Sequence, residues 1–91
     1  MNLVWDGTKA ASNLLKHGVS FTQAGAVFLD AGSVSFFDAA HSHDEDRYVT
    51  VGADTEGRLL YVVHTDDGAS VRLISARTAS SYEREQYERN R

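Results

Sequence analysis

Arginine, tyrosine and histidine side chains on the predicted strands of this chain are of the types needed for chemistry on RNA. If the strands pair as expected below, Arg72 lies beside Tyr48 and Tyr61, with Arg77 and His64 near the rims of the same sheet. An arginine next to exposed aromatic rings suits single-stranded RNA, because the guanidinium holds a phosphate while the rings stack on bases. Cleavage through the ribose 2′-hydroxyl requires a base, an acid and a cation that stabilises the phosphorane, and these residue types supply all three. The structural alternative is that Arg72 pairs with a partner protein and that His64 is a hydrogen-bonded rim residue.

The usual sequence signatures of enzymes are absent. The chain has no phosphate loop, dinucleotide-binding glycine pattern, nucleophile elbow or paired-histidine helix motif. It also has no Cys, which excludes disulfides, thiol nucleophiles and cysteine-type zinc sites. The run from His41 to Asp46 contains metal-ligand residue types, but its spacing fits no standard site, and we interpret it as a solvated loop. We therefore expect neither a metal nor a cofactor.

Lys9, Asn13 and Lys16 form a polar stripe on the first predicted helix. The stripe could contact phosphates, yet the outer face of any soluble amphipathic helix carries such residues, so both interpretations stay open. The formal net charge of -4 argues against long-range electrostatic capture of nucleic acid. Contact with RNA would therefore depend on a local basic site.

The elements that must position these residues can be read from caps and periodicity. Asp6 and Ser20 are predicted N-caps of two helices whose apolar residues recur every three to four positions. Further along, the period changes to two, which predicts strands, and Ser80 with Glu83 forms a capping box for a last helix. The predicted elements are a strand at 3–5, helices at 7–17 and 21–29, strands at 33–37, 47–53, 58–65 and 70–76, and a helix at 82–90.

These elements predict an α+β fold within one domain of residues 1–91, since this length is that of a single small domain. Two N-terminal helices pack on a four-stranded antiparallel sheet, with a short N-terminal strand and a C-terminal helix. No apolar run approaches the roughly 20 residues of a membrane span, and the first residues lack the features of a signal peptide. We therefore expect a cytoplasmic protein without membrane contact.

An Asp-Gly pair before the last strand predicts a two-residue hairpin turn, which fixes the expected register of the sheet. Arg72 then lies opposite Val63, and a short loop at 54–57 places Tyr48 opposite Val63 on the other side. The helix-covered face would hold Val49, Val51, Leu60, Val62, Val71 and Leu73, with Arg47, Arg58, His64, Ser75 and Arg77 toward its ends. The other, mixed face would carry the function and hold Tyr48, Thr50, Leu59, Tyr61, Val63, Thr65, Ser70, Arg72, Ile74 and Ala76.

Two spaced motifs in this chain resemble the BrnT family. The first combines Trp5-Asp6 and the Lys9, Asn13, Lys16 stripe with His17-Gly18-Val19 and Phe21, and the second is the block Arg72-Leu73-Ile74-Ser75-Ala76-Arg77, preceded by Arg47 and His64-Thr65. BrnT proteins are ribonuclease toxins of type II toxin-antitoxin pairs with a fold similar to RelE-type toxins. The resemblance implies an endoribonuclease that acts on mRNA without a metal. It also implies a BrnA-like antitoxin with a ribbon-helix-helix part, so that DNA is contacted only through that partner.

The resemblance makes the basic strand positions the best candidates for RNA contact or cleavage. Together with the residue chemistry, it predicts a catalytic set of Arg72, Arg77, His64 and Arg47, and an RNA-binding set of Tyr48, Tyr61, Lys9 and Lys16. No single residue is assigned as the general base. The alternative function is a non-catalytic binding module whose exposed sheet face docks a protein partner.

Overall fold

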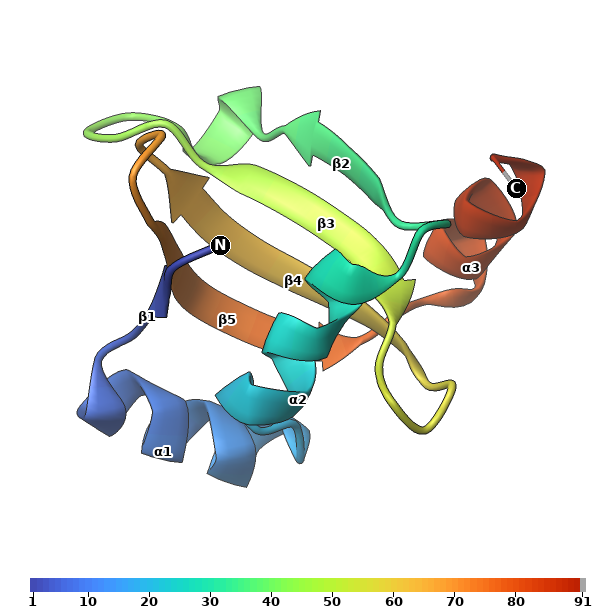
Figure 1. The fold of residues 1–91 in the computed structure, drawn as a ribbon, viewed down its shortest axis with the longest axis horizontal. Helices are drawn as coiled ribbons and strands as arrows, with labels where there is room; N and C mark the ends of the chain where they lie inside the picture. Colours follow the sequence, from blue (N-terminus) through green and yellow to red (C-terminus); the bar gives the residue numbers. More distant parts are fainter. Residues whose placement is uncertain (91) are drawn as a thin grey trace.

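The computed structural model describes residues 1–90 and shows an α+β fold, as predicted (Figure 1). The expected second helix is in fact a short α-helix followed directly by a 3-10 helix. The elements in chain order are β1 (Leu3–Val4), α1 (Gly7–His17), α2 (Phe21–Gly25), the 3-10 helix η1 (Ala26–Leu29), β2 (Val34–Phe37), the 3-10 helix η2 (Ala39–His41), β3 (Tyr48–Ala53), β4 (Leu59–Asp66), β5 (Val71–Thr78) and α3 (Ser81–Arg89).

Local capping interactions set the ends of the N-terminal helices where the sequence predicts them. The Asp6 carboxylate accepts hydrogen bonds from the first turn of α1, including one of 2.8 Å from the Thr8 amide. Gly18 ends α1 with φ +70°, a left-handed conformation that favours glycine. Ser20 and Gln23 form a reciprocal capping box at the start of α2. None of these contacts reaches beyond neighbouring turns, so the sequence suffices to locate them.

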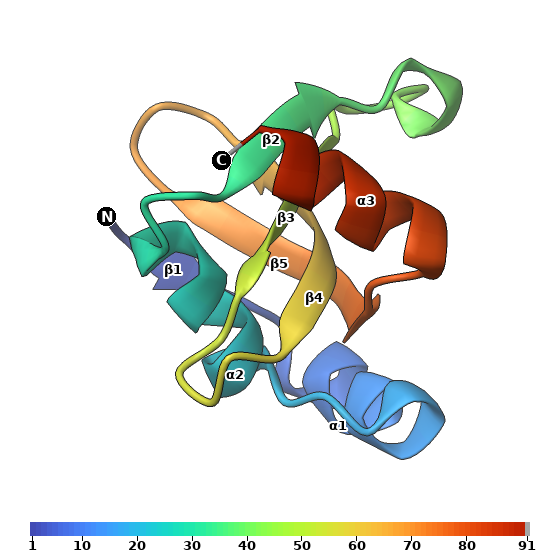
Figure 2. The same cartoon turned by 90° about the vertical axis from the view of Figure 1, so that its right-hand side faces the viewer.

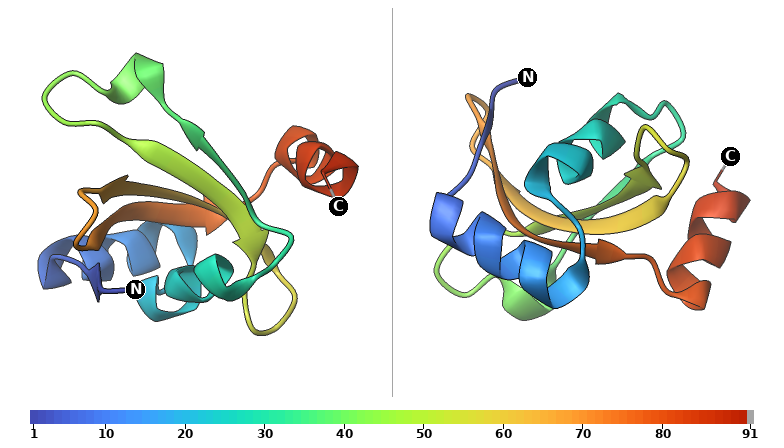
Figure 3. Two further views of the ribbon diagram at one scale, coloured as in Figure 1. Left: turned by 45° about the horizontal axis from the view of Figure 1, so that its top comes forward. Right: turned by 90° about the horizontal axis from the view of Figure 1, so that it is seen from below.

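The five strands form one mixed sheet in the order β1-β5-β4-β3-β2. Strand β1 runs parallel to β5, and the other neighbours are antiparallel. Figure 3 shows α1 and α2 on one side of the sheet, with α3 at the far end of the strands. Within residues 1–90, no helix is long and apolar enough to cross a membrane.

The register of the sheet differs from the prediction because both turns close at other residues than expected. The Asp54 amide donates to the Arg58 carbonyl at 2.9 Å, which shifts the pairing by one residue and places Tyr48 opposite His64 rather than Val63. In the next hairpin, the Asp67 amide donates to the Ser70 carbonyl at 3.2 Å, so the two residues enclosed by the turn are Gly68 and Ala69 rather than Asp67 and Gly68. Thr65 consequently lies opposite Arg72.

The β4–β5 pairing also contains a β-bulge. Arg72 lies opposite Thr65 instead of the predicted Val63, and Ser75 takes the place opposite Val63. Between these two pairs, β5 contains one residue more than β4, which is Ile74. An extra residue inverts the side-chain alternation that follows it, so the second half of β5 presents opposite faces from those predicted.

These shifts correct the predicted faces of the sheet. Arg72, Tyr61, Val63 and Leu59 lie on the face away from α1 and α2, as expected. Val49 and Val51 also lie on that face, in a cluster with Leu59 and Tyr87, and not on the helix-covered face. The residues that move to the helix-covered face are Tyr48, Thr50 and Ala76, and those that leave it are Arg47, Ser75 and Arg77.

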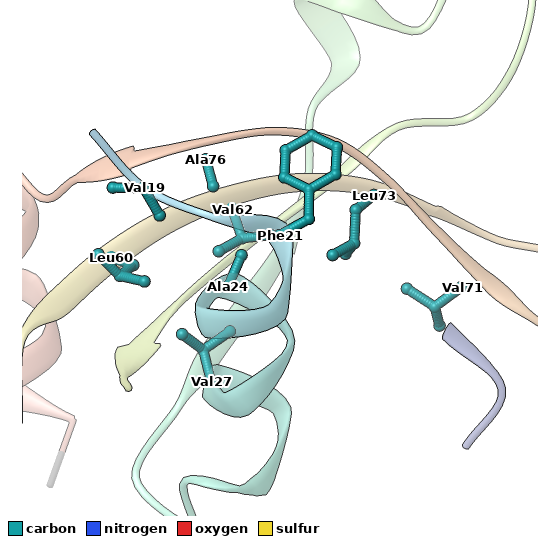
Figure 4. Close-up of a cluster of buried hydrophobic side chains, with 9 residues drawn as sticks. All are labelled: Val19, Phe21, Ala24, Val27, Leu60, Val62, Val71, Leu73 and Ala76. Atoms are coloured by element: carbon teal, nitrogen blue, oxygen red, sulfur yellow. The ribbon is translucent and has the colours of Figure 1, made fainter. Parts of the chain in front are cut away.

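The main hydrophobic core lies between α1, α2, η1 and the helix-covered face of the sheet (Figure 4). Side chains of the helices pack directly on side chains of the strands. The residues that are fully buried include Val19, Ala24, Val27, Leu60 and Val62. The 3-10 helix η1 approaches β3 at Gly52, where an added Cβ would lie 3.1 Å from the Val27 Cβ and carbonyl oxygen. The core consists of Val19, Phe21, Ala24, Val27, Leu60, Val62, Val71, Leu73 and Ala76.

Asn13 joins α1 to the sheet, in contrast to its predicted place on an outer stripe. Its Nδ2 donates to the carbonyls of Val19 and Ala76 at 3.0 and 2.9 Å, and its Oδ1 accepts from the Ala76 amide at 3.0 Å. Leu15, expected on the apolar inner stripe, is 91% exposed. Helix α1 is therefore rotated about its axis so that a polar residue faces inward, because the open edge of β5 needs hydrogen-bond partners.

Helix α3 packs against the opposite face of the sheet and is held more firmly than expected. Tyr87 is buried with Val49, Val51 and Leu59, and its hydroxyl donates to Asp30 at 2.7 Å. Figure 2 looks onto α3, which lies beside β2 at one end of the sheet. Of its two predicted anchors, Tyr87 is buried, whereas Tyr82 stays exposed.

Candidate functional site

The sheet face turned away from α1 and α2 carries Arg47, Arg72 and Arg77, and we call it the arginine face. Arg72 lies between Val71 and Leu73, both in the main core, so its own side chain emerges on the other side. Arg77 follows buried Ala76 and emerges there for the same reason. Arg47 continues the β2–β3 ladder, since its carbonyl accepts from the Asp38 amide at 2.8 Å.

Arg77 is fixed at the α3 end of the arginine face. Its Nη1 and Nη2 donate to the two carboxylate oxygens of Glu83, both at 2.8 Å, in a bidentate ion pair. The guanidinium carbon lies 3.9 Å from the centre of the Tyr61 ring. Glu83 also accepts from the Ser80 amide at 2.8 Å, which is part of the α3 capping box. The start of α3 therefore orients Arg77 over Tyr61.

Hydrogen bonds, burial and nearby charges shift the pKa values of Glu83, Arg77 and Tyr61. The hydrogen bonds from Arg77 lower the pKa of Glu83, and those to Glu83 raise the pKa of Arg77. Desolvation raises the pKa of Tyr61, and the nearby Glu83 carboxylate raises it further. Tyr61 is consequently a neutral phenol at neutral pH, suited to stacking and not to abstracting a proton.

Arg72 and Arg47 lie at the other end of the arginine face. From Arg72 to Arg77 there are five residues of strand, which is about 17 Å at roughly 3.3 Å per residue. Arg72 donates to Glu45 at 2.6 Å, and this contact lowers the pKa of the Glu45 carboxyl. Arg47 is half-buried, and its buried Nε has no hydrogen-bond partner among residues 1–90. Of the three arginines, Arg47 is thus the one whose guanidinium is not engaged by a carboxylate hydrogen bond.

The loop between β2 and β3 adds two histidines to this end of the face. A cavity of about 190 Å³ is lined by His41, His43, Asp44, Glu45 and Arg47. The Nδ1 atom of His41 lies 2.9 Å from the Oδ2 atom of Asp38, the residue that follows β2. The loop is largely solvent-exposed, as predicted, and it also brings imidazole, carboxylate and guanidinium groups to the lining of one cavity.

His64 and Tyr48 are absent from the arginine face. His64 is 5% exposed, and its Nε2 lies 2.8 Å from the Thr50 hydroxyl on the helix-covered side. The ring contacts Phe28 edge-on at 4.9 Å and stacks on Tyr48 at 6.1 Å. Burial lowers the pKa of His64, so the ring is neutral at neutral pH. The predicted grouping of Tyr48 and His64 with Arg72 is wrong. The one-residue register shift turns Tyr48 away from Arg72, whereas His64 lies on the helix-covered face that the register predicted for it and is buried there instead of lying at an open rim.

Lys9 and Lys16 lie on α1 and are exposed. Lys9 has a weak electrostatic effect on Glu45, so it lies within range of the Arg72 end of the face. Lys16 is in the last turn of α1, where its charge complements the helix dipole. The structure places the two lysines beside the sheet and does not bring them into the arginine face.

The described part of the chain contains no group of three or more His, Cys, Asp or Glu side chains arranged to hold a metal ion. The acidic run 44–46 does not converge with the histidines into such a set. At the Arg47 end of the arginine face, the imidazoles of His41 and His43 can transfer protons and the guanidinium of Arg47 can stabilise negative charge.

Sequence reasoning missed the His41–Asp38 pair and the ion pairs of Arg72 and Arg77. A histidine three residues after an aspartate was the local signal for the first, since a single helical turn brings such residues together. The Glu83 contact combines a capping box with a strand arginine six residues earlier, and Glu45 lies 27 residues before Arg72. Spacing alone does not reveal contacts of these two kinds.

Comparisons with known proteins point in one direction. A family model described as the ribonuclease toxin BrnT of type II toxin-antitoxin systems matches residues 5–83. Among solved structures, the chain is similar to the crystal structure of the Brucella abortus ribonuclease toxin BrnT, with a TM-score of 0.70 and 25% sequence identity. The match covers 89% of this chain and 99% of that chain. Comparison with curated proteins finds no match.

Proposed function

Because the chain belongs to the BrnT family of ribonuclease toxins of type II toxin-antitoxin systems, we propose that it cleaves RNA, mRNA in particular, on its arginine face and without a metal ion. A toxin of this kind has an antitoxin partner. The observation that carries the proposal is the placement of Arg47, Arg72 and Arg77 on the one sheet face that α1 and α2 leave uncovered.

The two ends of the arginine face suit different parts of an RNA strand. The guanidinium of Arg77 is held over the Tyr61 ring, which provides a platform where a base can stack beside a fixed cation. Arg47 and Arg72, about 17 Å away along the strand, can hold the backbone at a second point. A single-stranded RNA laid along the face would contact both ends, whereas a mononucleotide would reach only one.

Charge stabilisation of the phosphorane falls to the arginines in this proposal. The donor sets favour metal-free catalysis, because magnesium needs oxygen ligands in a near-octahedral arrangement and the described residues form no such cluster. Arg47 lines the same cavity as the imidazoles of the 38–46 loop, and Arg72 is bonded to Glu45 of that lining, so charge stabilisation and proton transfer are available at the same place.

The test is cleavage of a defined RNA by the purified chain, with growth arrest on expression as the cellular readout. Arg47→Ala, Arg72→Ala and Arg77→Ala should each lose about 10²- to 10³-fold in rate, as is typical when one group that stabilises transition-state charge is removed. Arg89→Ala is the matched control, because Arg89 is exposed on α3 and pairs within the helix with Glu85 at 2.9 Å. Undiminished cleavage and toxicity in all three variants would exclude the arginine face.

We also propose that a BrnA-like antitoxin, carrying a ribbon-helix-helix DNA-binding part, inhibits the toxin by covering this face. Acidic side chains of the partner would pair with Arg47 and Arg72 and compete with the RNA. DNA would be contacted by the antitoxin, in keeping with the net charge of -4 of this chain. Bound to its antitoxin, the toxin would then be both inactive and recruited to the operator.

Hydrogen exchange of the free chain and of the antitoxin complex tests the docking site. Covering the arginine face should protect the amides of β4 and β5 around Tyr61 and Arg72, together with those at the start of α3. The opposite side of the molecule offers an alternative, since Trp5, Leu14 and Leu29 are exposed around α1 and η1. Protection confined to α1 and η1 would contradict inhibition by covering the arginines.

A further inference from the structure

The loop that follows β2 is closed on itself by its own hydrogen bonds. The Ser42 hydroxyl donates to the Asp38 carbonyl at 2.6 Å and accepts from the Arg47 amide at 2.9 Å. Asp38 and Arg47 are also joined by a backbone hydrogen bond of 2.8 Å. One side chain thus ties together the end of β2, the turn η2 and the start of β3. His41, at the end of η2, is held at a defined place beside Arg47.

His41 has the partner arrangement of a proton-transfer group. Its Nδ1 faces the Asp38 carboxylate at 2.9 Å, so that nitrogen carries the proton and Nε2 presents the lone pair. Nε2 has no hydrogen-bond partner among residues 1–90. The side chain lines the 190 Å³ cavity with His43, Glu45 and Arg47.

We propose that His41 is the general base of RNA cleavage, that Asp38 is the residue that positions it, and that His43 is the general acid. This inference rests on the proposed function and deepens it, because it identifies where on the arginine face the scissile phosphate is bound. The phosphate lies at the Arg47 and Arg72 end, while Arg77 and Tyr61 hold the strand further along.

In this step, one bond to phosphorus replaces another and two protons are transferred. Nε2 of His41 takes the proton of the ribose 2′-hydroxyl as that oxygen attacks the adjacent phosphorus. The new bond joins O2′ to phosphorus, and the bond from phosphorus to O5′ breaks. His43, in its protonated form, gives a proton to O5′. The products are a 2′,3′-cyclic phosphate and a free 5′-hydroxyl, and Arg47 stabilises the charge of the pentavalent intermediate state.

Other titratable groups of the molecule are less suited to the role. His64 is buried on the opposite side of the sheet, and Tyr61 remains protonated at neutral pH. Glu45 is engaged by Arg72 at 2.6 Å, which lowers its pKa and makes it a weak base. The groups that surround His41 are those named above, namely Asp38 and the residues lining the cavity, including Asp44.

The experiment measures cleavage by variants of the full chain on two substrates. One is an RNA with a single defined scissile phosphate, and the other is the same RNA with sulfur in place of the bridging O5′ atom of that phosphate. The sulfur leaves without protonation, so it removes the need for a general acid and retains the need for a base. His41→Gln should lose about 10²-fold or more on both substrates. His43→Gln should lose activity on the oxygen substrate and regain it on the sulfur substrate. His17→Gln, exposed at the end of α1, is the matched control and should cleave both like the parent chain.

Asp38→Asn and Asp38→Glu test the positioning role through separate values of kcat and KM. Loss of the carboxylate should lower kcat while KM for RNA stays unchanged, and Asp38→Glu, which keeps an acceptor for Nδ1, should recover part of kcat. An equal loss in both variants would show that Asp38 has only a structural role. Chain folding is checked by circular dichroism.

The outcomes separate this inference from the proposed function. A parent chain that cleaves no RNA, alone or with ribosomes, would overturn the proposed function. Cleavage by the parent chain with an unaffected His41→Gln variant would overturn only the base assignment. A His41→Gln defect that the sulfur substrate relieves would also overturn it, because His41 would then be the acid.

Discussion

The side chain of Asn13 substitutes for a missing strand beside β5, and we predict that removing it costs much of the stability of the domain. Strand β1 pairs with β5 only at Val71 and Arg72, so the edge of β5 beyond it has no strand neighbour. The Asn13 amide fills that position with one hydrogen bond from the Ala76 amide and one to the Ala76 carbonyl, and a third bond reaches Val19.

The magnitude follows from these three bonds. Each buried hydrogen bond contributes about 1 kcal/mol net, and a buried group left without a partner costs about 1 to 3 kcal/mol. In Asn13→Ala, the higher helix propensity of alanine offsets about 0.5 kcal/mol. We therefore expect unfolding free energy to fall by about 3 kcal/mol, which lowers Tm by about 12 to 24 °C in a domain of this size.

Urea unfolding followed by circular dichroism and by Trp5 fluorescence measures the loss, since Trp5 packs edge-on against Phe21 at 6.1 Å. Asn90→Ala is the control, because its Nδ2 makes an exposed bond of 2.8 Å to the Gln86 carbonyl. Asn13→Asp should be at least as destabilised as Asn13→Ala, because a carboxylate oxygen would face the two carbonyls that Nδ2 now serves. A loss below about 1 kcal/mol in Asn13→Ala would refute this account of the β5 edge.

Three further predictions concern metal dependence and pH. EDTA should leave RNA cleavage intact, and activity abolished by chelation and restored by magnesium would transfer the site to the acidic 44–46 loop. Glu83→Gln should remove the ion pair with Arg77 and lower the free energy of unfolding. The pKa of Glu83 is lowered in the folded state, so the pair stabilises the fold at pH values above the ordinary pKa of 4.5. This contribution is lost as the pH falls through the pKa of the folded state. Urea titrations of parent and variant should therefore converge at low pH, and a constant gap would show that the charge of Glu83 is unimportant. Burial lowers the pKa of His64 in the folded state, so as the pH falls the His64 imidazole is protonated in the unfolded chain before it is protonated in the folded chain. The free energy of unfolding should therefore decline as the pH falls below 6.5, the ordinary pKa of histidine. His64→Gln should flatten that decline, and an unchanged slope would assign it to another group.

Much of the fold could be predicted because its signals are local. The caps at Asp6, Ser20 and Ser80 begin helices within a residue of the predicted starts, and Gly18 ends α1 as expected. A side-chain oxygen bonded to an amide two or three residues away does not depend on the rest of the molecule. The strand periods are local for the same reason, and they placed all four long strands.

The candidate site was predicted only in part. Arg72 and Tyr61 lie on the uncovered face, as expected, whereas Tyr48 lies on the opposite one, where His64 was already expected. The wrong placement of Tyr48 follows from the turn between β3 and β4, because a shift of one residue in the pairing exchanges the two faces of a strand. The bulge in β5 had the same effect on Arg77, which moved onto the arginine face.

By itself, the sequence determined the order of the α-helices and strands, as well as the family motifs that identify the chain as a BrnT-type toxin. The tertiary structure alone decided which side chains meet. Asn13 contacts Ala76 across 63 residues of sequence, and Arg72 contacts Glu45 across 27. The physical reason is that capping and periodicity act over one helical turn or one strand step. The register of a sheet and the inward face of a helix, in contrast, are chosen by the satisfaction of buried polar groups and the packing of a shared core, which depend on the whole chain at once.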